Sequence, residues 1–588
     1  MNAWIWIFGG ILFYWGVVSI LEAGDRLPDT VNVTGPLLTV HTKRGRALLD
    51  TLAAPRKLWR AWGNFGLGFA LVILAGTFAM LVFNAVSVLR HPPSPTAVNQ
   101  PQNVLVIPGV NEFLPLSVAP EIVLGLFIGM VVHEGGHGIL SRAGDIEVES
   151  MGVALLAFVP LGAFVQPDEE SQRAADRGSR ARMFAAGVTN NFLITVLVFA
   201  LLFGPVVGAM GVAEGAAIGG VMPGSAAQHA GIEAGDRIVS VQGVNVTSNQ
   251  DLERALSNVD RATVTVTLAS GERTTVERSI LVTGVAAASP FADLGVNATI
   301  GRVDRTPVHT ETGLERVLSN TTTATLVTKG GNAVSGPVGS LVRIVEGGPA
   351  AAAGFPAGES MIVTHVGGER VVDHRDLQRA LGEYGPGSTV RIVGFVDGDR
   401  RASSVTLGEQ SDGSSYLGVM VYPGISGLTV SDFGTKLYPA DTYLRILSGE
   451  AAGPGIVGFV RSIGTVLVLP FVGTLGTTGL EYNFAGFVGS NANFYVMQGW
   501  LAHLGGLGFA FANLLFWTGW INLNLGFFNC IPAFPLDGGH LLRMSAEAVV
   551  ARLPIEDGRA ATRAITISVG VTMLVSLITM LFGPQLLA

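Results

Sequence analysis

Two histidines and a glutamate fall within five residues of one apolar stretch of the sequence, His133-Glu-Gly-Gly-His137. On a helix, side chains four positions apart share a face, so both imidazoles could direct a nitrogen at one Zn²⁺ ion. Glu134 lies beside the first histidine, where its carboxylate could take a proton from an attacking water. The spacing therefore predicts a zinc site with a general base.

The apolar sequence around the two histidines strengthens this prediction. The five-residue pattern alone arises by chance in many proteins. A charged group at the centre of a membrane helix, however, costs about 2.5–3.5 kcal/mol, so a cluster of ionisable residues there indicates a function. The alternative is that the three side chains reach the membrane surface and bind nothing.

A third ligand is required, because catalytic zinc sites of this kind use three protein ligands and a water. The segment Asn529-Cys-Ile-Pro-Ala-Phe-Pro-Leu-Asp-Gly-Gly539 contains one carboxylate, that of Asp537. Its two prolines interrupt an apolar helix, and interrupted backbone at membrane depth is tolerated only inside protein or along a wet cavity. Asp537 is therefore the candidate, although Asp-Gly-Gly taken alone could be a simple turn.

The elements that must position these groups are long apolar segments. A membrane-spanning helix needs about 20 mostly apolar residues, and six segments meet this requirement: 3–21, 65–89, 122–140, 184–210, 504–528 and 564–582. A further apolar stretch, 455–479, contains Arg461 and many glycines and could either span the membrane or lie at its surface. The first segment has no positive charge at its start and no Ala-x-Ala-like cleavage site, so we interpret it as an anchor.

The composition agrees with a polytopic α-helical membrane protein of six or seven transmembrane helices. Of its 588 residues, 49% are hydrophobic and 14% are charged, against about 25% charged residues in soluble proteins. These values exclude a soluble enzyme of this size and a disordered chain. The net charge of −8 predicts no basic surface, so we expect the lipid bilayer as a partner and no direct nucleic acid. The single cysteine, Cys530, excludes an intramolecular disulfide.

The distribution of lysine and arginine between loops predicts the orientation of the chain. Such residues are frequent between Lys43 and Arg60 and again between Arg142 and Arg182, whereas the Pro-rich stretch 91–114 contains none. We therefore expect a multi-pass protein of a cell membrane, with both basic loops in the cytoplasm. By alternation, the long polar insert after Met210 is external, and the candidate zinc site lies towards the cytoplasmic side. The preference for arginine over lysine is typical of a GC-rich prokaryotic genome.

The external insert contains internal repeats. Gly224-Ser-Ala-Ala-Gln-His-Ala-Gly231 and Gly348-Pro-Ala-Ala-Ala-Ala-Gly354 are each followed by a sequence of the form Asp-Leu-x-Arg-Ala-Leu. Between them, Leu314-Glu-Arg-Val-Leu-Ser-Asn320 repeats Leu252-Glu-Arg-Ala-Leu-Ser-Asn258. These units resemble circularly permuted PDZ domains of prokaryotes. The resemblance implies two tandem PDZ-like domains with a degenerate copy between them; the alternative is a generic external α/β domain.

Together, the motifs resemble those of the site-2 protease family of intramembrane zinc metalloproteases. His-Glu-x-x-His and Asn-x-x-Pro-x-x-x-Leu-Asp-Gly are typical of two separate membrane helices in that family. The segment Ala186-Gly-Val-Thr-Asn-Asn-Phe192 is similar to the family's Gly-x-x-x-Asn motif, with Gly187 and Asn191 matching, and 152–167 is similar to its membrane-associated hairpin.

This resemblance implies roles for individual residues. The zinc ligands would be His133, His137 and Asp537, and Glu134 would be the general base. Asn529 would help to hold the substrate or the oxyanion, and Asn191 would assist from the neighbouring helix.

The resemblance also implies a domain organisation. The predicted parts are two N-terminal transmembrane helices with a basic loop, the first half of the protease core, a PDZ-like domain, a degenerate PDZ-like segment, a second PDZ-like domain and the second half of the core. Their boundaries are 1–115, 116–212, 213–283, 284–333, 334–427 and 440–588.

The expected activity is regulated intramembrane proteolysis, in which the protein cuts transmembrane helices of other membrane proteins. The resemblance implies that the PDZ-like domains admit substrates whose external part has already been trimmed. The alternative from another class is a non-catalytic membrane adaptor that holds peptides on these domains. A metal transporter is a third hypothesis, but it would need metal-binding groups spread along a pathway.

Overall fold

The computed structural model describes residues 3–28, 30–93, 107–111, 114–157, 159–410, 413–476 and 479–587. The chain divides into two compact units. We call them the helical unit, which contains Met1–Gly211, Asp441–Ala492 and Val496–Ala588, and the sheet unit, which contains Val212–Ala440 and Asn493–Tyr495. Most of the Pro-rich stretch that we predict to be external, 94–106, lies outside the described residues.

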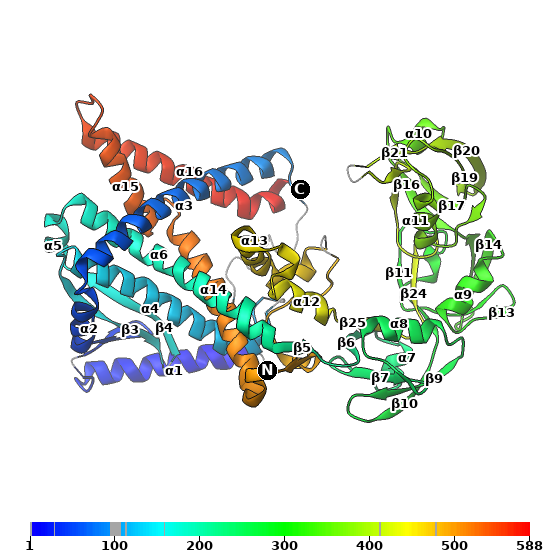
Figure 1. The fold of residues 1–588 in the computed structure, drawn as a ribbon, viewed down its shortest axis with the longest axis horizontal. Coiled ribbons are helices and arrows are strands. Elements are labelled where there is room, and N and C mark those ends of the chain that lie inside the picture. The colour runs from blue at the N-terminus through cyan, green and yellow to red at the C-terminus, as the bar shows by residue number, and fades with distance from the viewer. Residues whose placement is uncertain are drawn as a thin grey trace. The chain divides into compact units, whose positions relative to one another are not determined.

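Three helices that contact one another form the centre of the helical unit (Figure 1). They are α4 (Ala119–Ala143), α6 (Arg177–Leu201) and α14 (Gly506–Asn529). Beside them, α3 (Arg56–Arg90) packs against α16 (Gly558–Leu587), and α15 (Asp537–Val550) contacts both α6 and α16. The remaining α-helices described in this unit are α1 (Ala3–Ala23), α2 (Lys43–Ala53), α5 (Glu169–Ala174), α12 (Ala440–Leu447) and α13 (Gly455–Val468).

Local sequence explains where the central helices begin and how closely they approach. Pro120 stands in the first turn of α4, where a missing N–H costs nothing. The carboxylate of Asp176 caps α6 by accepting a hydrogen bond from Ser179 N at 3.0 Å. Gly125 on α4 lies against the backbone of α14, where a Cβ atom would meet Thr518 N at 3.1 Å. Small residues of this kind allow membrane helices to pack backbone against backbone.

A four-stranded antiparallel sheet lies within the helical unit in the order β1–β2–β3–β4. Its strands are β1 (Val31–Thr34), β2 (Leu37–His41), β3 (Val148–Leu156) and β4 (Val159–Pro167). The hairpin of β3 and β4 coincides with the predicted hairpin 152–167. In the described sheet β4 is an edge strand, and it lies against α4.

Among the described residues, five helices are long and apolar enough to cross a membrane. They are Arg56–Arg90, Leu116–Ala143, Arg177–Ala209, Gly455–Thr474 and Gly558–Leu587. Three of them contain a whole predicted span, and Arg177–Ala209 contains all of the predicted span 184–210 except its last residue. The remaining helix, Gly455–Thr474, covers most of the stretch 455–479 that the sequence left open. The predicted span 504–528 forms α14, which is not among the five because its asparagines lower its mean hydropathy, and the first predicted span retains a shorter apolar helix, Gly9–Ala23. The chain is thus compatible with a membrane protein, and the number of crossings stays a prediction.

The described residues of the sheet unit form three sheets of six strands with the same strand order. The first sheet has the order β10 (Arg273–Glu277), β9 (Thr263–Leu268), β7 (Arg237–Val241), β6 (Ala216–Val221) and β25 (Thr435–Leu437), with β8 (Val244–Asn245) beside β7. The second has the order β15 (Ala333–Pro337), β14 (Thr323–Thr328), β12 (Thr299–Val303), β11 (Ile280–Val285) and β24 (Leu428–Ser431), with β13 (Thr306–Pro307) beside β12. The third has the order β20 (Asp399–Thr406), β19 (Thr389–Val396), β17 (Ser360–Val366), β16 (Ser340–Ile344) and β23 (Val419–Val421), with β18 (Glu369–Arg370) beside β17.

Each of these sheets has its own apolar core and one longer helix, namely α8 (Asn249–Ser257), α9 (Glu311–Leu318) or α11 (His374–Gly382). The segment 284–333, which the sequence suggested to be a degenerate copy, contributes most of the second sheet and the helix α9. Its strand order matches that of the other two sheets once β24, which comes from a later part of the chain, is included.

One returning segment supplies that last strand to all three sheets. Strands β23, β24 and β25 follow one another between Val419 and Leu437, and they close the third, second and first sheet respectively. The structural units are therefore nested, so the domain boundaries do not fall in simple succession along the chain.

Candidate active site

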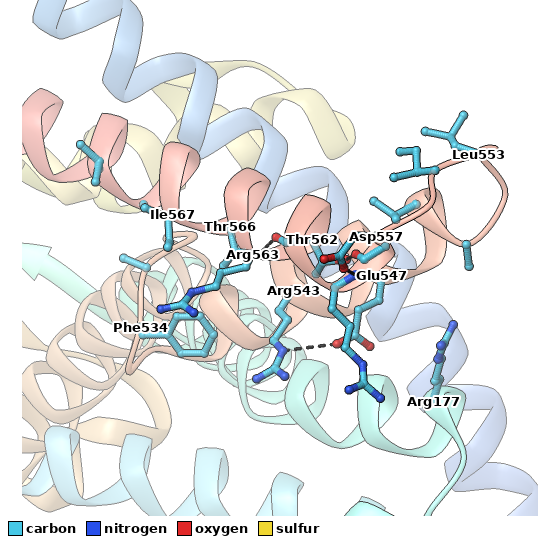
Figure 2. A pocket seen from close by; sticks show the side chains of 18 of the residues that line it. Arg177, Phe534, Arg543, Glu547, Leu553, Asp557, Thr562, Arg563, Thr566 and Ile567 are labelled. Carbon is cyan, nitrogen blue, oxygen red and sulfur yellow. Dashed lines mark hydrogen bonds and ion pairs between the residues drawn. The ribbon is translucent and has the colours of Figure 1, made fainter.

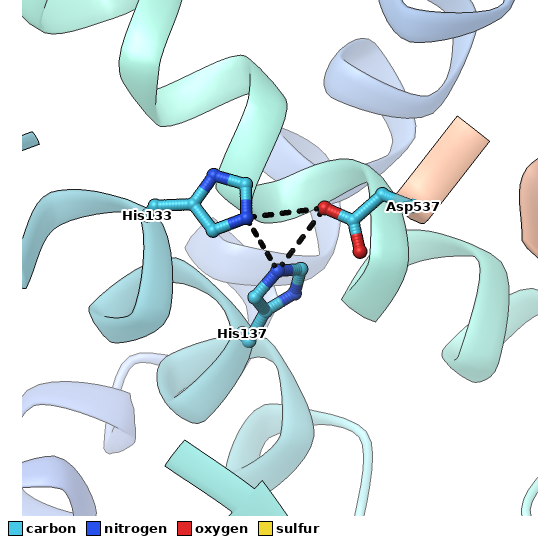
Figure 3. A group of neighbouring side chains, drawn as sticks. All are labelled: His133, His137 and Asp537. Atoms are coloured by element: carbon cyan, nitrogen blue, oxygen red, sulfur yellow. Dashed lines mark hydrogen bonds and ion pairs between the residues drawn. The ribbon is translucent and has the colours of Figure 1, made fainter. Parts of the chain in front are cut away.

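His133, His137 and Asp537 lie together in the helical unit, although about 400 residues separate the histidines from the aspartate in the sequence (Figure 3). Both histidines are on one face of α4, and Asp537 is the first residue of α15. The two Nε2 atoms are 3.1 Å apart, and Asp537 Oδ2 is 3.2 Å from each of them. All three side chains are largely buried, with at most 12% of any side chain exposed.

The hydrogen bond of His137 decides which of its nitrogens faces the other two groups. His137 Nδ1 lies 2.8 Å from the carbonyl oxygen of Met183, and only a protonated Nδ1 can donate to that oxygen. In a neutral imidazole, Nε2 then carries a lone pair and no proton. The lone pair of His137 Nε2 therefore points at a second imidazole and a carboxylate oxygen.

This arrangement requires a positive charge at its centre, because facing lone pairs repel one another. Asp537 Oδ2 is buried and accepts no hydrogen bond of normal geometry among the described residues. A tetrahedral zinc ion with bonds of about 2.0–2.1 Å separates its ligand atoms by about 3.3–3.4 Å. The observed separations of 3.1 and 3.2 Å are close to that value. The donor set, two imidazoles and one carboxylate, is also one that catalytic zinc sites use, so the three residues fit the ion.

Gly187 on α6 makes room for the two imidazole rings. A Cβ atom at this position would lie 2.6 Å from His133 Cε1 and 2.6 Å from His137 Nε2. Any side chain there would displace both rings. This steric requirement gives a physical reason for the glycine of the Gly-x-x-x-Asn segment.

Asn191, one turn further along α6, contacts the first histidine from behind. Its side chain is fully buried, and its Nδ2 lies 3.2 Å from His133 Nδ1, while its Oδ1 has no partner among the described residues. A half-turn of the amide exchanges these two atoms and would let Oδ1 accept a proton from Nδ1. In that orientation Asn191 fixes His133 with its Nε2 lone pair towards the site, as partners of metal-binding histidines do.

Glu134 is half-buried next to the pair of histidines, and its carboxylate contacts the β3–β4 hairpin. Val165 N on β4 donates a hydrogen bond to Glu134 Oε2 at 2.9 Å. The hydrogen bond joins the candidate base to an edge strand. The sequence predicted both the base and the hairpin. It could not predict their contact, because the contact uses a backbone N–H, which almost every residue has.

Asn529 makes a different contact from those of the cluster. It is the last residue of α14, and its Nδ2 donates to the carbonyl oxygen of Leu525 in the same helix at 3.0 Å. The structure thus brings His133, His137, Asp537, Glu134 and Asn191 into one neighbourhood, whereas the amide of Asn529 is engaged within its own helix. Sequence reasoning missed the carbonyl oxygen of Met183, again a backbone atom.

The loop before Asp537 explains why two glycines follow this residue. A Cβ atom on Gly538 would lie 2.4 Å from the carbonyl oxygen of Ile531, and one on Gly539 would lie 2.8 Å from Ala533 C. Both glycines therefore allow the start of α15 to pack directly on the proline-containing loop. This close packing places Asp537 at the histidines.

Comparison with known families gives one match that covers more than half of the chain. The model of peptidase family M50 matches residues 121–366 and 452–577. These two ranges contain the histidine motif on α4 and the aspartate at the start of α15.

Individual relatives agree with this match. A protein of Vibrio cholerae named "Putative zinc metalloprotease" is 23% identical over 463 residues, which cover 73% of this chain and 90% of that protein. A protein of Mesorhizobium japonicum with a similar name is 31% identical over 194 residues, and an uncharacterized protein of Methanocaldococcus jannaschii is 29% identical over 179 residues. These two matches cover 26% and 30% of this chain, and the chain spans about half the length of these two relatives, 51% and 46%.

The predicted family and cofactor are therefore confirmed. Proteases of the matching family use zinc, which agrees with the three-residue cluster that fits this ion. The chain is a membrane-associated zinc metalloprotease by family, and it belongs to peptidase family M50, the family of the site-2 proteases.

Proposed function

We propose that the protein is an intramembrane zinc metalloendopeptidase that cleaves transmembrane segments of other membrane proteins. The observation that supports this most is the meeting of His133, His137 and Asp537 within 3.2 Å of one another, with Glu134 beside them. Metal-dependent hydrolysis of a peptide needs a metal ion, a base and access for the substrate, and this neighbourhood offers candidates for all three.

The chain's own residues divide the work between them. Zinc held by His133, His137 and Asp537 would activate a water and polarise the carbonyl group of the scissile peptide. Glu134 would take the proton of the attacking water and pass it to the leaving nitrogen. Asn191 and the carbonyl oxygen of Met183 are positioning groups, because each contacts the Nδ1 atom of one histidine.

The edge strand β4 is the proposed binding site for the substrate backbone. An intact helix uses its carbonyl groups in internal hydrogen bonds, so the substrate must unwind before it is cut. An unwound segment can add to an exposed sheet edge through backbone hydrogen bonds. Because Val165 N on β4 reaches Glu134, a strand added at this edge would pass close to the base.

The orientation and the substrate filter complete the proposal. From the loop charges, the protein is a multi-pass protein of the cell membrane with its active site towards the cytoplasmic side and its sheet unit outside. The three sheets would act as PDZ-like domains that admit substrates whose external part has been trimmed. Asn529 would turn its amide from Leu525 to the substrate or the oxyanion when a substrate is present.

The test is a comparison of Glu134→Gln with wild type in the full-length protein. The variant should keep zinc, because it removes no ligand, but cleavage of a reporter with one transmembrane helix should fall by at least about 100-fold, the lower range for a general base. Zinc content and cleavage are measured on the same purified sample. Glu170→Gln, an exposed residue of α5, is the matched control and should behave as wild type.

Two outcomes would contradict the proposal. Wild-type cleavage rates in Glu134→Gln would exclude this residue as the base. A wild-type protein that holds zinc but leaves every transmembrane reporter intact, while it binds peptides on the sheet unit, would favour the non-catalytic adaptor.

A further inference from the structure

A cavity of about 1280 Å³ in the helical unit has no role in the proposed hydrolysis (Figure 2). It lies between α15, α16 and the start of α6, and its wall includes Ala533 and Phe534 of the loop before Asp537. Its volume is above the range of about 300–1000 Å³ that is usual for pockets that hold drug-sized ligands. The cavity therefore has room for a ligand longer than a small metabolite.

Four arginines from three helices line the cavity: Arg177 of α6, Arg543 of α15, and Arg559 and Arg563 of α16. Arg543 forms an ion pair with Glu547 at 3.3 Å. The other three arginines make no ion pair with a carboxylate in the part of the chain that the structure describes.

The acidic groups of the same wall are partly engaged elsewhere. Asp557 Oδ1 accepts hydrogen bonds from the backbone nitrogens of Arg559 and Ala560 at 3.1 and 3.0 Å, and so caps α16. Glu547 is held by Arg543, and Glu556 is exposed. The wall still carries four arginines against three carboxylates, which leaves a net charge of one positive unit, so an anion is the complementary ligand.

The other end of the cavity is apolar and follows one face of α16. Arg563, Ile567, Val571 and Leu574 are spaced by three or four residues and share that face. The three apolar side chains are between 52% and 57% exposed. At about 1.5 Å per residue, the face runs about 16 Å from Arg563 to Leu574, which is about half of the 30 Å hydrocarbon core of a bilayer.

Gly570 leaves the apolar part of the cavity open. A Cβ atom built on this residue meets no other atom within 4 Å. The cavity thus has free space along the apolar face of α16.

We propose that this cavity binds one anionic phospholipid, with its headgroup at the arginine-lined end of the wall and one acyl chain along α16. Guanidinium groups recognise phosphate with paired hydrogen bonds, and basic pockets between membrane helices bind anionic headgroups. A free phosphate would leave the 16 Å apolar face without a ligand, and an acidic peptide would place polar backbone against it. The site requires only that α16 lies in the membrane, and it does not depend on the proposed proteolysis.

Native mass spectrometry of the full-length protein tests this proposal. The protein is reconstituted in vesicles of phosphatidylcholine with an equal amount of phosphatidylglycerol, extracted in mild detergent, and titrated with either lipid. Wild type should retain one phosphatidylglycerol in preference to phosphatidylcholine. The double variant Arg177→Gln/Arg563→Gln should bind phosphatidylglycerol about 30-fold more weakly, because each arginine near a membrane surface contributes about a factor of five to six.

Two further variants separate the headgroup from the chain. Gly570→Leu places a side chain in the cavity at a position where its Cβ atom meets no other protein atom within 4 Å, so it should weaken phosphatidylglycerol binding even if the arginine variant fails to fold. Arg552→Gln is the matched control, because it removes the same charge between α15 and α16 from a residue that does not line the cavity. It should bind the lipid as wild type does.

Each contrary result identifies another ligand or none. Equal retention of phosphatidylcholine and phosphatidylglycerol by wild type would overturn the proposal. Displacement of the lipid by inorganic phosphate at a similar concentration would assign the arginines to a free anion, and displacement by a polyglutamate peptide would assign them to an acidic protein segment. Unchanged lipid affinity in Gly570→Leu would show that the acyl chain does not lie in the cavity.

Discussion

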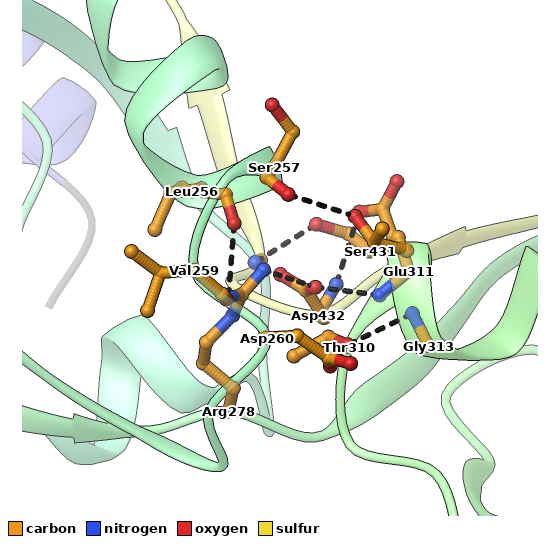
Figure 4. Close-up of polar contacts among 12 residues, drawn as sticks. Leu256, Ser257, Val259, Asp260, Arg278, Thr310, Glu311, Gly313, Ser431 and Asp432 are labelled. Atoms are coloured by element: carbon orange, nitrogen blue, oxygen red, sulfur yellow. Dashed lines mark hydrogen bonds and ion pairs between the residues drawn. The ribbon is translucent and has the colours of Figure 1, made fainter. Parts of the chain in front are cut away.

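The helical unit and the sheet unit each bury an aspartate, and the surroundings of the two carboxylates differ. Asp432 in the sheet unit accepts hydrogen bonds at Oδ2 from Arg278 Nη2 at 2.5 Å and from Glu311 N at 2.6 Å (Figure 4). Asp537 in the helical unit faces two imidazole nitrogens, of which that of His137 carries no proton in its neutral form. The charge of Asp432 is balanced by an arginine of the protein, whereas the charge of Asp537 requires a bound cation to balance it.

This difference separates a structural ion pair from a site for chemistry. Arg278 joins the first sheet to the second, because its Nη1 donates to the carbonyl oxygens of Leu256 and Val259 while its Nη2 holds Asp432. A buried charge therefore does not by itself indicate a functional site when the protein also supplies the opposite charge. What indicates a functional site at Asp537 is that its Oδ2 atom has no hydrogen-bond donor among the described residues.

The largest expected effect breaks the metal cluster. In Asp537→Ala the zinc content of the purified full-length protein should fall from about one ion per chain to a small fraction, because only two of the three protein ligands remain. Elemental analysis measures it. Asp441→Ala, which removes an exposed carboxylate paired with Arg445, is the control and should keep its zinc. Unchanged zinc in Asp537→Ala would require a different third ligand.

The second effect breaks the ion pair of the sheet unit. Asp432→Ala leaves Arg278 buried without its partner, which should cost about 3–5 kcal/mol of the stability of the sheet unit. Hydrogen exchange of residues 212–440 in the intact protein measures the loss. Zinc content should not change.

Asp260 gives a graded control for that measurement. Its carboxylate also connects the first two sheets, through Thr310 and Arg316, but the ion pair is 40–61% exposed. Asp260→Ala should therefore cost only about 1 kcal/mol or less in ion pairing. Equal losses in Asp432→Ala and Asp260→Ala would show that burial does not distinguish the two pairs.

The third expected effect concerns a residue that contacts a zinc ligand but is not itself a ligand. Asn191→Ala removes the amide behind His133 and should weaken zinc binding by about 10- to 100-fold, the range for groups that orient metal-binding histidines. Competition with a fluorescent chelator measures the affinity. Asn190→Ala is the neighbouring control, since the Asn190 side-chain oxygen accepts a hydrogen bond from Trp62 Nε1 at 3.0 Å. If both variants lost the same affinity, the effect would be one of helix packing.

The ligand chemistry was predictable from sequence, because it demands particular residue types at particular spacings. His133 and His137 share a helix face by their four-residue separation, and Asp537 was the one carboxylate of an interrupted apolar helix. The contacts of Asn191 and Met183 were not predictable in this way. They depend on how α6 crosses α4, and many small packing contacts decide that crossing.

The sequence also could not predict which strands complete the three sheets. Strands β23 and β25 have three residues each, too few to show an alternating pattern. Each pairs with a strand far away in the sequence, as β25 does with β6, which lies more than 200 residues earlier. The middle repeat looked degenerate because it lacks the small-residue motif that forms the short helices Ala226–His229 and Pro349–Ala352 of the other two; it has a single 3-10 turn, Ala292–Leu294, instead.

The smallest effect tests whether the sheet unit's cluster responds to pH. Burial and the charge of Asp432 raise the pKa of Glu311 from 4.5 to about 7. The hydrogen bond that Asp432 N donates to Glu311 and the charge of Arg375 oppose this increase, while Glu315 adds to it. Protonated Glu311 is thus favoured in the folded state. Its contribution to stability is complete below about pH 4.5 and is lost as the pH rises through about 7.

Hydrogen exchange of α9, corrected for the intrinsic rate, should accordingly be severalfold faster at pH 8 than at pH 6. Glu311→Gln, which is neutral at both values, should remove this difference, whereas Glu253→Gln, an exposed residue of α8, should leave it. A pH dependence that survives in Glu311→Gln would belong to another group. Equal exchange of the wild type at both values would mean that Arg278 neutralises Glu311 together with Asp432, so that the sheet unit's cluster is insensitive to pH and differs from the metal cluster in this respect as well.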